Sequence, residues 1–486
     1  MLSKLENQFS ITRAALSTRG RARSNVLSLV ILICSLIDPC FAEERKDADV
    51  IVVGAGISGL TASLSLAKHG AKVILLEKES SVGGRLMSAL VGGIPYNFGA
   101  QWIATGLQPV TDTYINRLRS QELHGNISLV WNGKLVNFGD SGFASSMSIS
   151  QKAQEDMVLA VDKMAKDANM LFNGNGRDYV YDIPSDSALW KRLEKQTIAQ
   201  YLAPYHPDVT TMWGARVGGG FGGTANDISA LVLVAWYRGN PSIPNAKLIK
   251  GGNHLLAEEM LKDCQQFGAK LVLEREVTEI SQHGKNVKVR CRNGQDYSAD
   301  YVVVTIPAYA ANKVIKGLSS KKRKALQAVK YNPITEVGLH IKNFPKSDKV
   351  AALMFIGGNI AAYINQTGEV TGHLDVGTVI VVTIMNSKMQ HLPDKQLIAN
   401  IVQELKVVSP SLNLENDVLE YVIKRWTIGE VHVTPGFLSK YQNTLMARAG
   451  NIYFAGEYVS NFPTWGGAVW AGSKAAEEVL VAMGKQ

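Results

Sequence analysis

The stretch DVIVVGAGISGLTASLSLAKHGAKVILLEKESSVGGR, residues Asp49–Arg85, decides the fold of this chain. The run Val50–Val53 is short, apolar and β-branched, as expected for a strand that is buried on both faces of a parallel sheet. A glycine-rich turn follows, and then a helix-forming segment that stops at Gly70. A second strand is predicted at Lys72–Leu76. This order of strand, turn, helix and strand is typical of a unit that binds a dinucleotide.

The residues of the turn each suit a pyrophosphate. Gly54 permits the tight turn, Gly56 lets the backbone approach the phosphates, and Gly59 lets helix and strand pack closely. The helix N-terminus offers unpaired N–H groups and a partial positive charge to the anion. An acid at the end of the second strand is placed to accept hydrogen bonds from a ribose. The predicted cofactor-binding residues of this unit are Gly54, Gly56, Ile57, Ser58, Gly59 and Glu77.

Two further segments separate FAD from NAD as the cofactor. Ser81–Arg85 contains Gly-Gly-Arg, and Asn97–Ile103 contains Gly-Ala-Gln-Trp. Both resemble segments of the FAD-dependent amine oxidase superfamily, which includes monoamine and polyamine oxidases, protoporphyrinogen oxidase and carotenoid desaturases. In that superfamily the arginine lies by the pyrophosphate and the second segment passes near the flavin ring. The resemblance therefore implies cofactor contacts for Gly84, Arg85, Gly99, Ala100, Gln101 and Trp102.

The second half of the chain extends this resemblance. Val277 matches a family valine whose backbone meets the adenine, and Glu457 matches a glutamate that binds the FAD ribitol. The resemblance adds Gly456, and it adds Gly467 and Ala468 at the start of the final helix. The N-terminus of such a helix would stabilise negative charge on the reduced ring. Because the two motif groups are about 370 residues apart, one shared cofactor is the simplest reason for both.

The resemblance covers nearly all of the chain after Asp47 and implies an α/β fold. A doubly wound, Rossmann-like FAD-binding domain is expected, discontinuous over residues 47–115, 245–310 and 425–486. An inserted α+β substrate domain is expected over residues 116–244 and 311–424. A chain of 486 residues, 46% hydrophobic, is long enough to bury the cores of two domains.

The chemistry that the resemblance implies is hydride removal from a substrate carbon to flavin N5. The substrate is a small molecule, with an amine as first candidate, and molecular oxygen is the expected electron acceptor. Noncovalent FAD is expected because no cysteine lies in the flavin-proximal C-terminal region. Cys264 and Cys291 lack CxxC spacing, so they define no metal site.

Two residues are catalytic candidates. Many amine-oxidising members carry a lysine on the first strand of the substrate-domain sheet, holding a water near flavin N5. The matching residue here is Glu336, and no lysine occurs between Tyr331 and Ile341. A carboxylate there either attracts a cationic amine or holds water. Trp465 precedes the last glycine pair, where amine-oxidising relatives place an aromatic side chain beside the flavin. The alternative is that Glu336 faces solvent and Trp465 is ordinary packing.

Three other functions stay open at this point. Because the lysine is missing, carbon–carbon dehydrogenation of the protoporphyrinogen oxidase or carotenoid desaturase type is an alternative to amine oxidation. A catalytically silent FAD-bound binding protein is the alternative outside the enzymes. A nicotinamide-dependent dehydrogenase would explain the first motif but neither Gly456–Glu457 nor the glycine-rich start of the last helix.

The first 42 residues have the parts of a secretory signal. A basic beginning is followed by the apolar run Val26–Ile37 and by Cys40–Ala42. We interpret this segment first as a signal for export, to the periplasm or outside the cell. An organellar transit sequence and an uncleaved membrane anchor are the alternatives, and membrane association is expected only through this segment.

The net charge of +9 does not indicate a nucleic-acid partner. The first 42 residues carry five basic and two acidic side chains, which leaves 46 against 40, or +6, for the rest. The densest basic cluster, Lys321–Lys324, is interpreted as a solvated helix face. The glycine-rich run Gly218–Gly223 follows no strand and is interpreted as a flexible loop rather than a phosphate-binding loop.

Overall fold

The computed structural model describes residues 46–101, 103–104, 109–118, 120–122, 127–137, 143–171, 181, 187–239, 246–345, 350–367 and 377–485. The chain divides into two units, Met1–Lys46 and Asp47–Gln486, and all helices and strands given below belong to the second. The predicted leader, residues 1–42, and the predicted cofactor residue Trp102 lie outside the described residues. Among the described residues, no helix combines the length and apolarity needed to cross a lipid bilayer.

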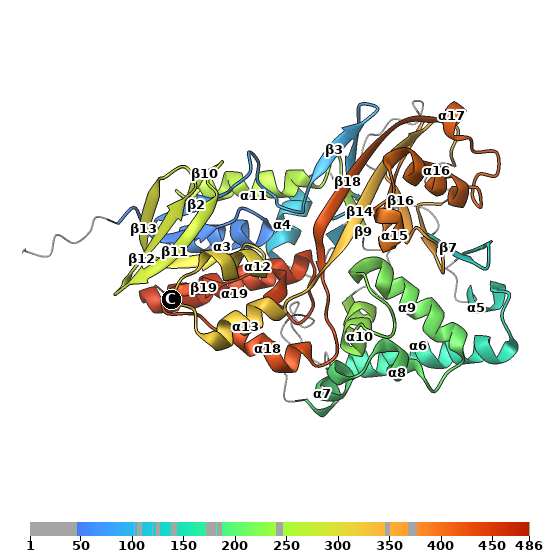
Figure 1. Ribbon diagram of the computed structural model, residues 1–486, viewed down its shortest axis with the longest axis horizontal. Helices are drawn as coiled ribbons and strands as arrows, with labels where there is room; N and C mark the ends of the chain where they lie inside the picture. Colours follow the sequence, from blue (N-terminus) through green and yellow to red (C-terminus); the bar gives the residue numbers. More distant parts are fainter. Residues whose placement is uncertain are drawn as a thin grey trace, which may run out of the picture. The chain divides into compact units, whose positions relative to one another are not determined.

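The first sheet has seven strands and carries the dinucleotide motif (Figure 1). Its order is β10 (Lys270–Val272), β2 (Val73–Leu76), β1 (Ala48–Val53), β13 (Asp296–Val304), β12 (Asn286–Cys291) and β11 (Val277–His283), with β19 (Ile452–Phe454) also paired to β13. Strands β10, β2, β1, β13 and β19 run parallel, and five of the six residues of β1 are buried. Parallel strands of this kind consist of continuous apolar residues, because helices cover both faces of the sheet and bury every side chain.

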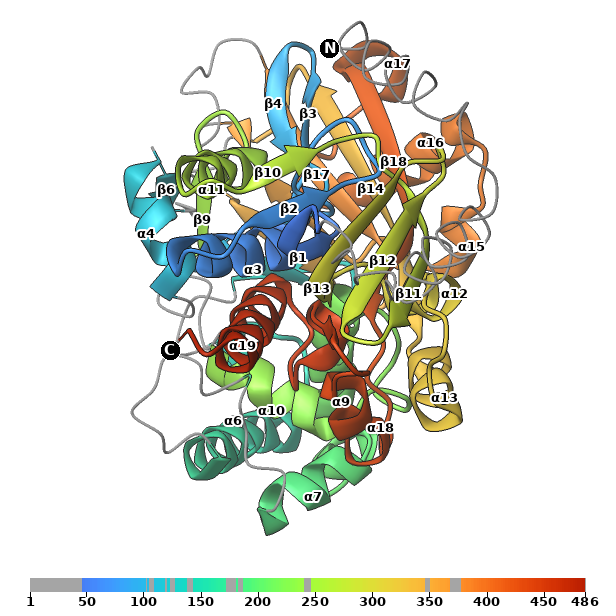
Figure 2. The same ribbon diagram turned by 90° about the vertical axis from the view of Figure 1, so that its left-hand side faces the viewer.

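Three helices from distant parts of the chain pack together beside this sheet. They are α3 (Ile57–Lys68), α11 (His254–Gln266) and α19 (Trp465–Met483), and α3 contacts both of the others (Figure 2). The N- and C-terminal motifs therefore meet in space, as one shared cofactor requires.

The second sheet also has seven strands. Its order is β18 (Val418–Val431), β14 (Tyr331–Ile341), β17 (Thr378–Ile384), β16 (Ala362–Asn365), β15 (Ala352–Phe355), β7 (Ile127–Trp131) and β8 (Lys134–Asn137). Alternate residues of β14 and β17 face opposite sides, since side chains alternate along a strand. One face packs on α16 (Asp394–Leu405), and the other packs on the hairpin of β3 (Ser88–Val91) and β4 (Ile94–Asn97).

The remaining elements are short. A three-stranded sheet joins β5 (Ile103–Ala104), β9 (Ala246–Ile249) and β6 (Ser120–Glu122). The other helices are α4 (Pro109–Arg117), α5 (Phe143–Ser146), α6 (Gln151–Leu171), α7 (Ala188–Lys195), α8 (Ile198–Leu202), α9 (Pro207–Phe221), α10 (Ala230–Gly239), α12 (Ala308–Val314), α13 (Ser320–Ala328), α15 (Ser387–Gln390), α17 (Leu414–Asp417) and α18 (Phe437–Met446), with the 3₁₀ turn η3 (Glu457–Val459). The predicted α/β class is confirmed, while the predicted domain boundaries stay a prediction.

The loop prediction for Gly218–Gly223 was wrong for residues 218–221, because α9 continues to Phe221, whereas Gly222 and Gly223 lie beyond the helix. Its glycines allow close packing rather than flexibility. A Cβ at Gly214 would lie 2.6 Å from that of Ala225, and one at Gly218 would lie 2.7 Å from the Gly223 carbonyl oxygen. The helix ends only at Gly222, whose φ of +64° suits glycine.

The prediction that Lys321–Lys324 forms a solvated face was wrong for Lys322. This side chain is 4% exposed, and its Nζ lies 3.3 Å from the ring centroid of Phe454. The Nζ donates to three carbonyls at the end of α18, those of Thr444 at 2.9 Å and of Leu445 and Ala447 at 2.7 Å. Burial lowers the pKa of Lys322 to about 7. Within the cluster, therefore, Lys322 caps the end of α18, Arg323 is half-buried, and Lys321 and Lys324 are exposed.

Candidate functional site

The glycine turn between β1 and α3 has the geometry that the sequence predicted. Gly54 has a φ of +103°, and a Cβ on Gly59 would lie 1.9 Å from the Gly54 carbonyl oxygen. A Cβ on Gly56, by contrast, would have no described atom within 4 Å. The first turn of α3, which includes Ile57 and Ser58, has no side-chain cap and no acidic residue. The helix N-terminus thus faces open space with its N–H groups available to an anion.

Glu77 lies at the end of β2 and orders this turn. Its Oε2 accepts a hydrogen bond from the Ala55 N–H at 2.7 Å, and its Oε1 accepts one from the Glu79 N–H at 3.0 Å. A carboxylate has about four acceptor sites, so two remain for a ribose. The strand that begins at Val277 starts near Glu77 in space, because the Arg275 N–H donates to the Glu77 carbonyl at 2.7 Å. The ribose and adenine contacts of these residues stay predictions.

The Gly83–Arg85 segment lies against the glycine turn. The Gly83 N–H donates to the Ala55 carbonyl at 2.9 Å, and a Cβ on Gly84 would lie 3.3 Å from the Gly56 Cα. The guanidinium of Arg85 then reaches two C-terminal residues. Its Nη1 donates to the Gly429 carbonyl and lies 2.6 Å from Glu457 Oε1.

Glu457 is buried and follows Gly456, whose φ is +111°. Burial raises the pKa of Glu457, and the positive charge of Arg85 opposes that rise. The structure therefore pairs two residues that the sequence assigned separately to the cofactor, one to its pyrophosphate and one to its ribitol.

The segment around Gly99 is fixed to the same arginine. A Cβ on Gly99 would lie 1.8 Å from the Arg85 carbonyl oxygen, and the Ala100 N–H donates to that oxygen at 3.0 Å. The carbonyl of Gln101 accepts hydrogen bonds from the side chains of Asn97, at 3.4 Å, and Asn253, at 3.2 Å.

Sequence reasoning missed these two asparagines as site residues. Asn97 directly precedes Phe98 in the Gly-Ala-Gln-Trp segment, and Asn253 follows Gly251–Gly252. A buried asparagine within a motif was the available signal, since a buried amide must find hydrogen-bond partners.

The start of α19 lies close to the start of α3. Thr464 caps α19 by accepting from the Gly467 N–H at 3.3 Å, and Ala468 is buried behind it. One turn later, a Cβ on Gly472 would lie 2.3 Å from the Ser58 carbonyl oxygen. The glycines therefore let the two helices touch through their backbones, which places both helix N-termini in one region.

Glu336 lies inside the protein, which rules out the alternative that it faces solvent. It is 5% exposed, and its Oε2 accepts hydrogen bonds from Gln101 Nε2 at 2.6 Å and Thr383 Oγ1 at 3.0 Å. Burial raises the pKa of Glu336 to about 8, although both hydrogen bonds act to lower it. The side chain thus joins the second sheet to the segment that the resemblance places near the flavin.

A lysine stands beside Glu336 on the neighbouring strand. In the sheet register, Glu336 on β14 is opposite Lys424 on β18 and Thr383 on β17, so all three side chains share one face. The Lys424 Nζ lies 4.6 Å from the ring centroid of Trp426 and 5.9 Å from that of Phe98. The cation that the sequence lacks on β14 is therefore present one strand away, held over aromatic rings.

Trp465 is the first residue of α19 and is half-buried against the main core. Among the described residues, no hydrogen bond or ring contact joins Trp465 to Glu336. Its position beside the flavin stays a prediction.

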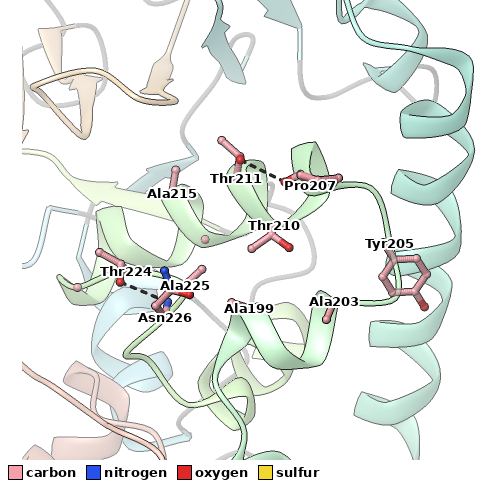
Figure 3. Close-up of a pocket in the computed structure, with 12 residues that line it drawn as sticks. Ala199, Ala203, Tyr205, Pro207, Thr210, Thr211, Ala215, Thr224, Ala225 and Asn226 are labelled. Carbon is pink, nitrogen blue, oxygen red and sulfur yellow. Dashed lines mark hydrogen bonds between the residues drawn. The ribbon is translucent and has the colours of Figure 1, made fainter.

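A surface hollow elsewhere, about 580 Å³ in volume, is lined mainly by α8, α9 and the loop after α9 (Figure 3). Its lining consists largely of small residues, including Ala199, Gly214 and Ala225, and contains none of the predicted cofactor or catalytic residues. We therefore do not assign the reaction to this hollow.

The residues brought together fit FAD. The uncapped α3 N-terminus with open space at Gly56 suits a pyrophosphate, and Glu77 retains acceptor sites for a ribose. The ion pair of Arg85 with Glu457 and the start of α19 complete a cradle built from both ends of the chain.

The chain is similar to known proteins over most of its length. The family model described as "Flavin containing amine oxidoreductase" matches residues 57–480. Polyamine oxidase 4 of Oryza sativa is 24% identical over 474 residues, which cover 90% of each chain. Human amine oxidase [flavin-containing] B is 24% identical over 478 residues, covering 90% of this chain and 87% of that protein. Nicotine dehydrogenase of Pseudomonas putida is 24% identical over 461 residues, which cover 89% of this chain and 88% of that protein.

Solved structures share the fold. Putrescine oxidase bound to putrescine superposes with a TM-score of 0.74 at 19% identity, covering 89% of this chain and 99% of that one. Cyclohexylamine oxidase of Brevibacterium oxydans superposes with a TM-score of 0.72 at 18% identity, covering 90% of this chain and 100% of that one. The fold matches over nearly the whole length of both enzymes.

Proposed function

The chain belongs to the flavin-containing amine oxidoreductase family, and from this premise we propose that it oxidises amines with noncovalent FAD and molecular oxygen. The observation that supports an amine substrate best is the buried carboxyl of Glu336. It lies on the sheet face that meets Gln101, where an acid can bind an ammonium group.

FAD would be held along the cradle described above. The N-terminus of α3 receives the pyrophosphate, Glu77 receives a ribose, and Glu457, fixed by Arg85, receives the ribitol. When bound, FAD supplies a flavin ring that accepts a hydride from the carbon next to the substrate nitrogen.

Glu336 would prepare the substrate for that transfer. As a carboxylate it binds the ammonium form of the amine, and it then takes a proton from the nitrogen onto a carboxyl oxygen. The neutral amine that remains has a free electron pair on nitrogen, which favours loss of hydride from the adjacent carbon. Gln101 and Thr383 hold the carboxyl in one position through both protonation states. Because the pKa is about 8, both states are accessible near neutral pH.

The surroundings of the two described cysteines support noncovalent FAD. Cys264 is buried in α11, and its Sγ donates to the Leu60 carbonyl at 3.4 Å. Cys291 is buried in β12, and neither thiol is paired. Acid or heat denaturation should release a free yellow cofactor with the mass of FAD. Colour that stays with the precipitated chain would refute noncovalent binding.

Molecular oxygen is the proposed acceptor, although the relatives include both oxidases and a dehydrogenase. A reduced sample exposed to air should recover its yellow colour and release peroxide at the same rate. Reoxidation only by an added dye or electron carrier would show a dehydrogenase instead.

The first 42 residues are proposed to direct export, with cleavage near Ala42. Intact-mass analysis of the protein from its native host should then find a chain that begins near Glu43. A chain that keeps Met1 would favour an uncleaved anchor.

A further inference from the structure

Lys424 is a half-buried cation on the sheet face that carries Glu336. It lies in β18 directly opposite Glu336 of β14, and Thr383 of β17 is opposite Glu336 on the other side. Residues that are directly opposite in neighbouring strands share a face, with Cβ atoms about 4.5–5.5 Å apart. A base and an acid therefore stand side by side where the proposed function places the substrate amine.

Aromatic rings, rather than an acid, hold the side chain of Lys424. Its Nζ lies 4.6 Å from the ring centroid of Trp426 and 5.9 Å from that of Phe98. The two rings stack with centroids 6.1 Å apart, and the Trp426 indole N–H donates to the Phe98 carbonyl at 2.7 Å. Within the described ranges, no carboxylate pairs with this Nζ and no acceptor takes a hydrogen bond from it. Its three N–H donors are thus unused by the described residues.

Both charges are held against one short segment. Gln101 Nε2 donates to Glu336 Oε2 at 2.6 Å, while Phe98, three residues earlier, fixes the ring beside Lys424. The family resemblance places this segment near the flavin ring. A substrate carbon that reaches the flavin there would have an acid and a cation on the same side of it.

The neighbouring charges of β18 have partners of their own. Arg425 points to the opposite face, where its Nη2 donates to Asp394 Oδ1 at 2.7 Å. Glu420 shares the face of Lys424 but lies further along the strand, and its Oε2 accepts from the Gly92 N–H of the β3–β4 hairpin at 2.7 Å. Neither side chain therefore pairs with Lys424.

Acids outnumber cations around the site. Glu430 is half-buried, and Glu457 and Glu336 act on it as negative charges while Arg85 acts as a positive one. If all are ionised, these three acids and Glu420 stand against Arg85 and Lys424, which leaves 4 − 2, or two negative charges. A free carboxylate would be repelled by this excess, whereas an amine that carries its own carboxylate adds no net charge.

We propose that Lys424 determines the substrate class by binding a carboxylate, so that the enzyme prefers amino acids, that is, amines with a carboxylate a few bonds from the nitrogen. The proposal rests on the amine oxidation of the proposed function. Glu336 receives the ammonium group and Lys424 the carboxylate. A second ammonium in the place of that carboxylate would meet Lys424 as a like charge, which disfavours diamines.

Two matched sets of substrates test this preference. Phenylalanine is compared with 2-phenylethylamine, and 4-aminobutanoate with butylamine and 1,4-diaminobutane. Anaerobic stopped-flow reduction of the flavin in the holoenzyme gives a dissociation constant and a limiting rate for each compound. Because a hydrogen bond between two charged groups is among the stronger ones, the carboxylated member of at least one set should bind roughly tenfold more tightly than its uncharged counterpart.

Three variants of Lys424 separate charge from packing. Lys424→Met keeps much of the side-chain volume but should reduce the ratio of affinities to about one. Lys424→Arg should keep the preference, since a guanidinium also binds carboxylates. Lys424→Glu should reverse it, so that 1,4-diaminobutane binds more tightly than 4-aminobutanoate. Visible absorbance and melting temperature show whether each variant is folded with FAD bound, and the Met and Arg variants carry the test if the Glu variant is not.

Lys440→Met is the matched control, because Lys440 is exposed in α18 and its Nζ also lies over a ring, 5.2 Å from the centroid of Tyr441. This variant should keep the wild-type preference. Equal affinities of wild type for carboxylated and uncharged amines in both sets, or a preference that survives in Lys424→Met, would overturn the role of Lys424 alone. Flavin that no amine reduces, with or without a carboxylate, would overturn the proposed function itself.

Discussion

Arg85 and Glu457 lie 457 − 85, or 372, residues apart in the chain, and their Nη1 and Oε1 atoms lie 2.6 Å apart in the structure. The pair joins the segment after the first βαβ unit to the turn after the last strand of the same sheet. Since Glu457 is 5% exposed, it depends on this guanidinium for its charge partner. The cofactor cradle is thus closed by a contact between the two ends of the folded unit.

Removing Arg85 should therefore destabilise the apoprotein as well as weaken FAD binding. Loss of one partner of a buried pair costs about 3–5 kcal/mol. Because the Arg85 side chain is 35% exposed to solvent, which weakens the pair, Arg85→Ala should lower the free energy of unfolding by about 2 kcal/mol. The free energy of unfolding in urea measures this loss. Adding Glu457→Gln should restore part of it, and a double variant as unstable as the sum of both singles would contradict the pairing.

Gly56 and Gly59 should respond differently to the same added methyl group. A Cβ on Gly56 meets no described atom within 4 Å and its φ is −70°, so Gly56→Ala should change the free energy of unfolding by less than about 0.5 kcal/mol. The methyl would nevertheless occupy the place of the phosphates, so FAD affinity should fall at least tenfold. In Gly59→Ala the Cβ would lie 1.9 Å from a backbone oxygen, so stability and FAD binding should both be lost.

Titration of FAD into each folded apoprotein, beside its urea curve, checks this contrast. Retention of wild-type FAD affinity by Gly56→Ala would place the pyrophosphate elsewhere.

The rate of flavin reduction by an amine should depend on Glu336. With its pKa at about 8, the carboxyl is neutral at low pH and becomes a proton acceptor as the pH rises. Wild-type reduction should therefore accelerate between pH 7 and pH 9. Glu336→Gln should be slower and lack that rise, while Thr383→Val, which removes one hydrogen bond, should keep a rise at shifted pH. Stopped-flow absorbance at saturating amine gives the rates, and a Gln variant with the wild-type profile would remove Glu336 from the reaction.

Lys322 should contribute to stability although it lies in a basic cluster. Lys322→Met keeps much of the side-chain volume but removes the donor that serves three carbonyls at the end of α18. Leaving buried carbonyls unpaired should cost about 2 kcal/mol in the free energy of unfolding. The matched control is Lys321→Met, on an exposed neighbour, which should change it by less than about 0.5 kcal/mol. Equal effects of both variants would show that the cap contributes nothing.

The sequence predicted what local pattern determines. Glycine positions 54, 56 and 59 and the acid at 77 were readable because turn, helix start and strand end follow one another within one short stretch. The α/β class followed from the buried apolar runs of β1 and β13 for the same reason.

What the sequence could not predict depends on contacts between distant residues. Lys424 lies in an ordinary strand pattern, and only the register of β18 on β14 places it opposite Glu336. The capping role of Lys322 requires the end of α18 to lie against α13, which no local pattern indicates. The glycines in α9 were wrongly interpreted as a loop. A glycine in a sequence can indicate either close backbone packing or a flexible turn, and only the neighbours in the fold show which one applies.

The central claim is tested most directly by mixing the yellow protein with amines in the absence of oxygen. Primary, secondary and polyamine substrates should be compared with polyunsaturated and tetrapyrrole precursors, and the visible absorbance of the flavin followed. The account predicts that at least one amine bleaches the flavin at a rate that saturates with its concentration, while the other classes leave it yellow. Bleaching by a polyunsaturated or tetrapyrrole precursor alone, or by dithionite but no substrate, would contradict amine oxidation.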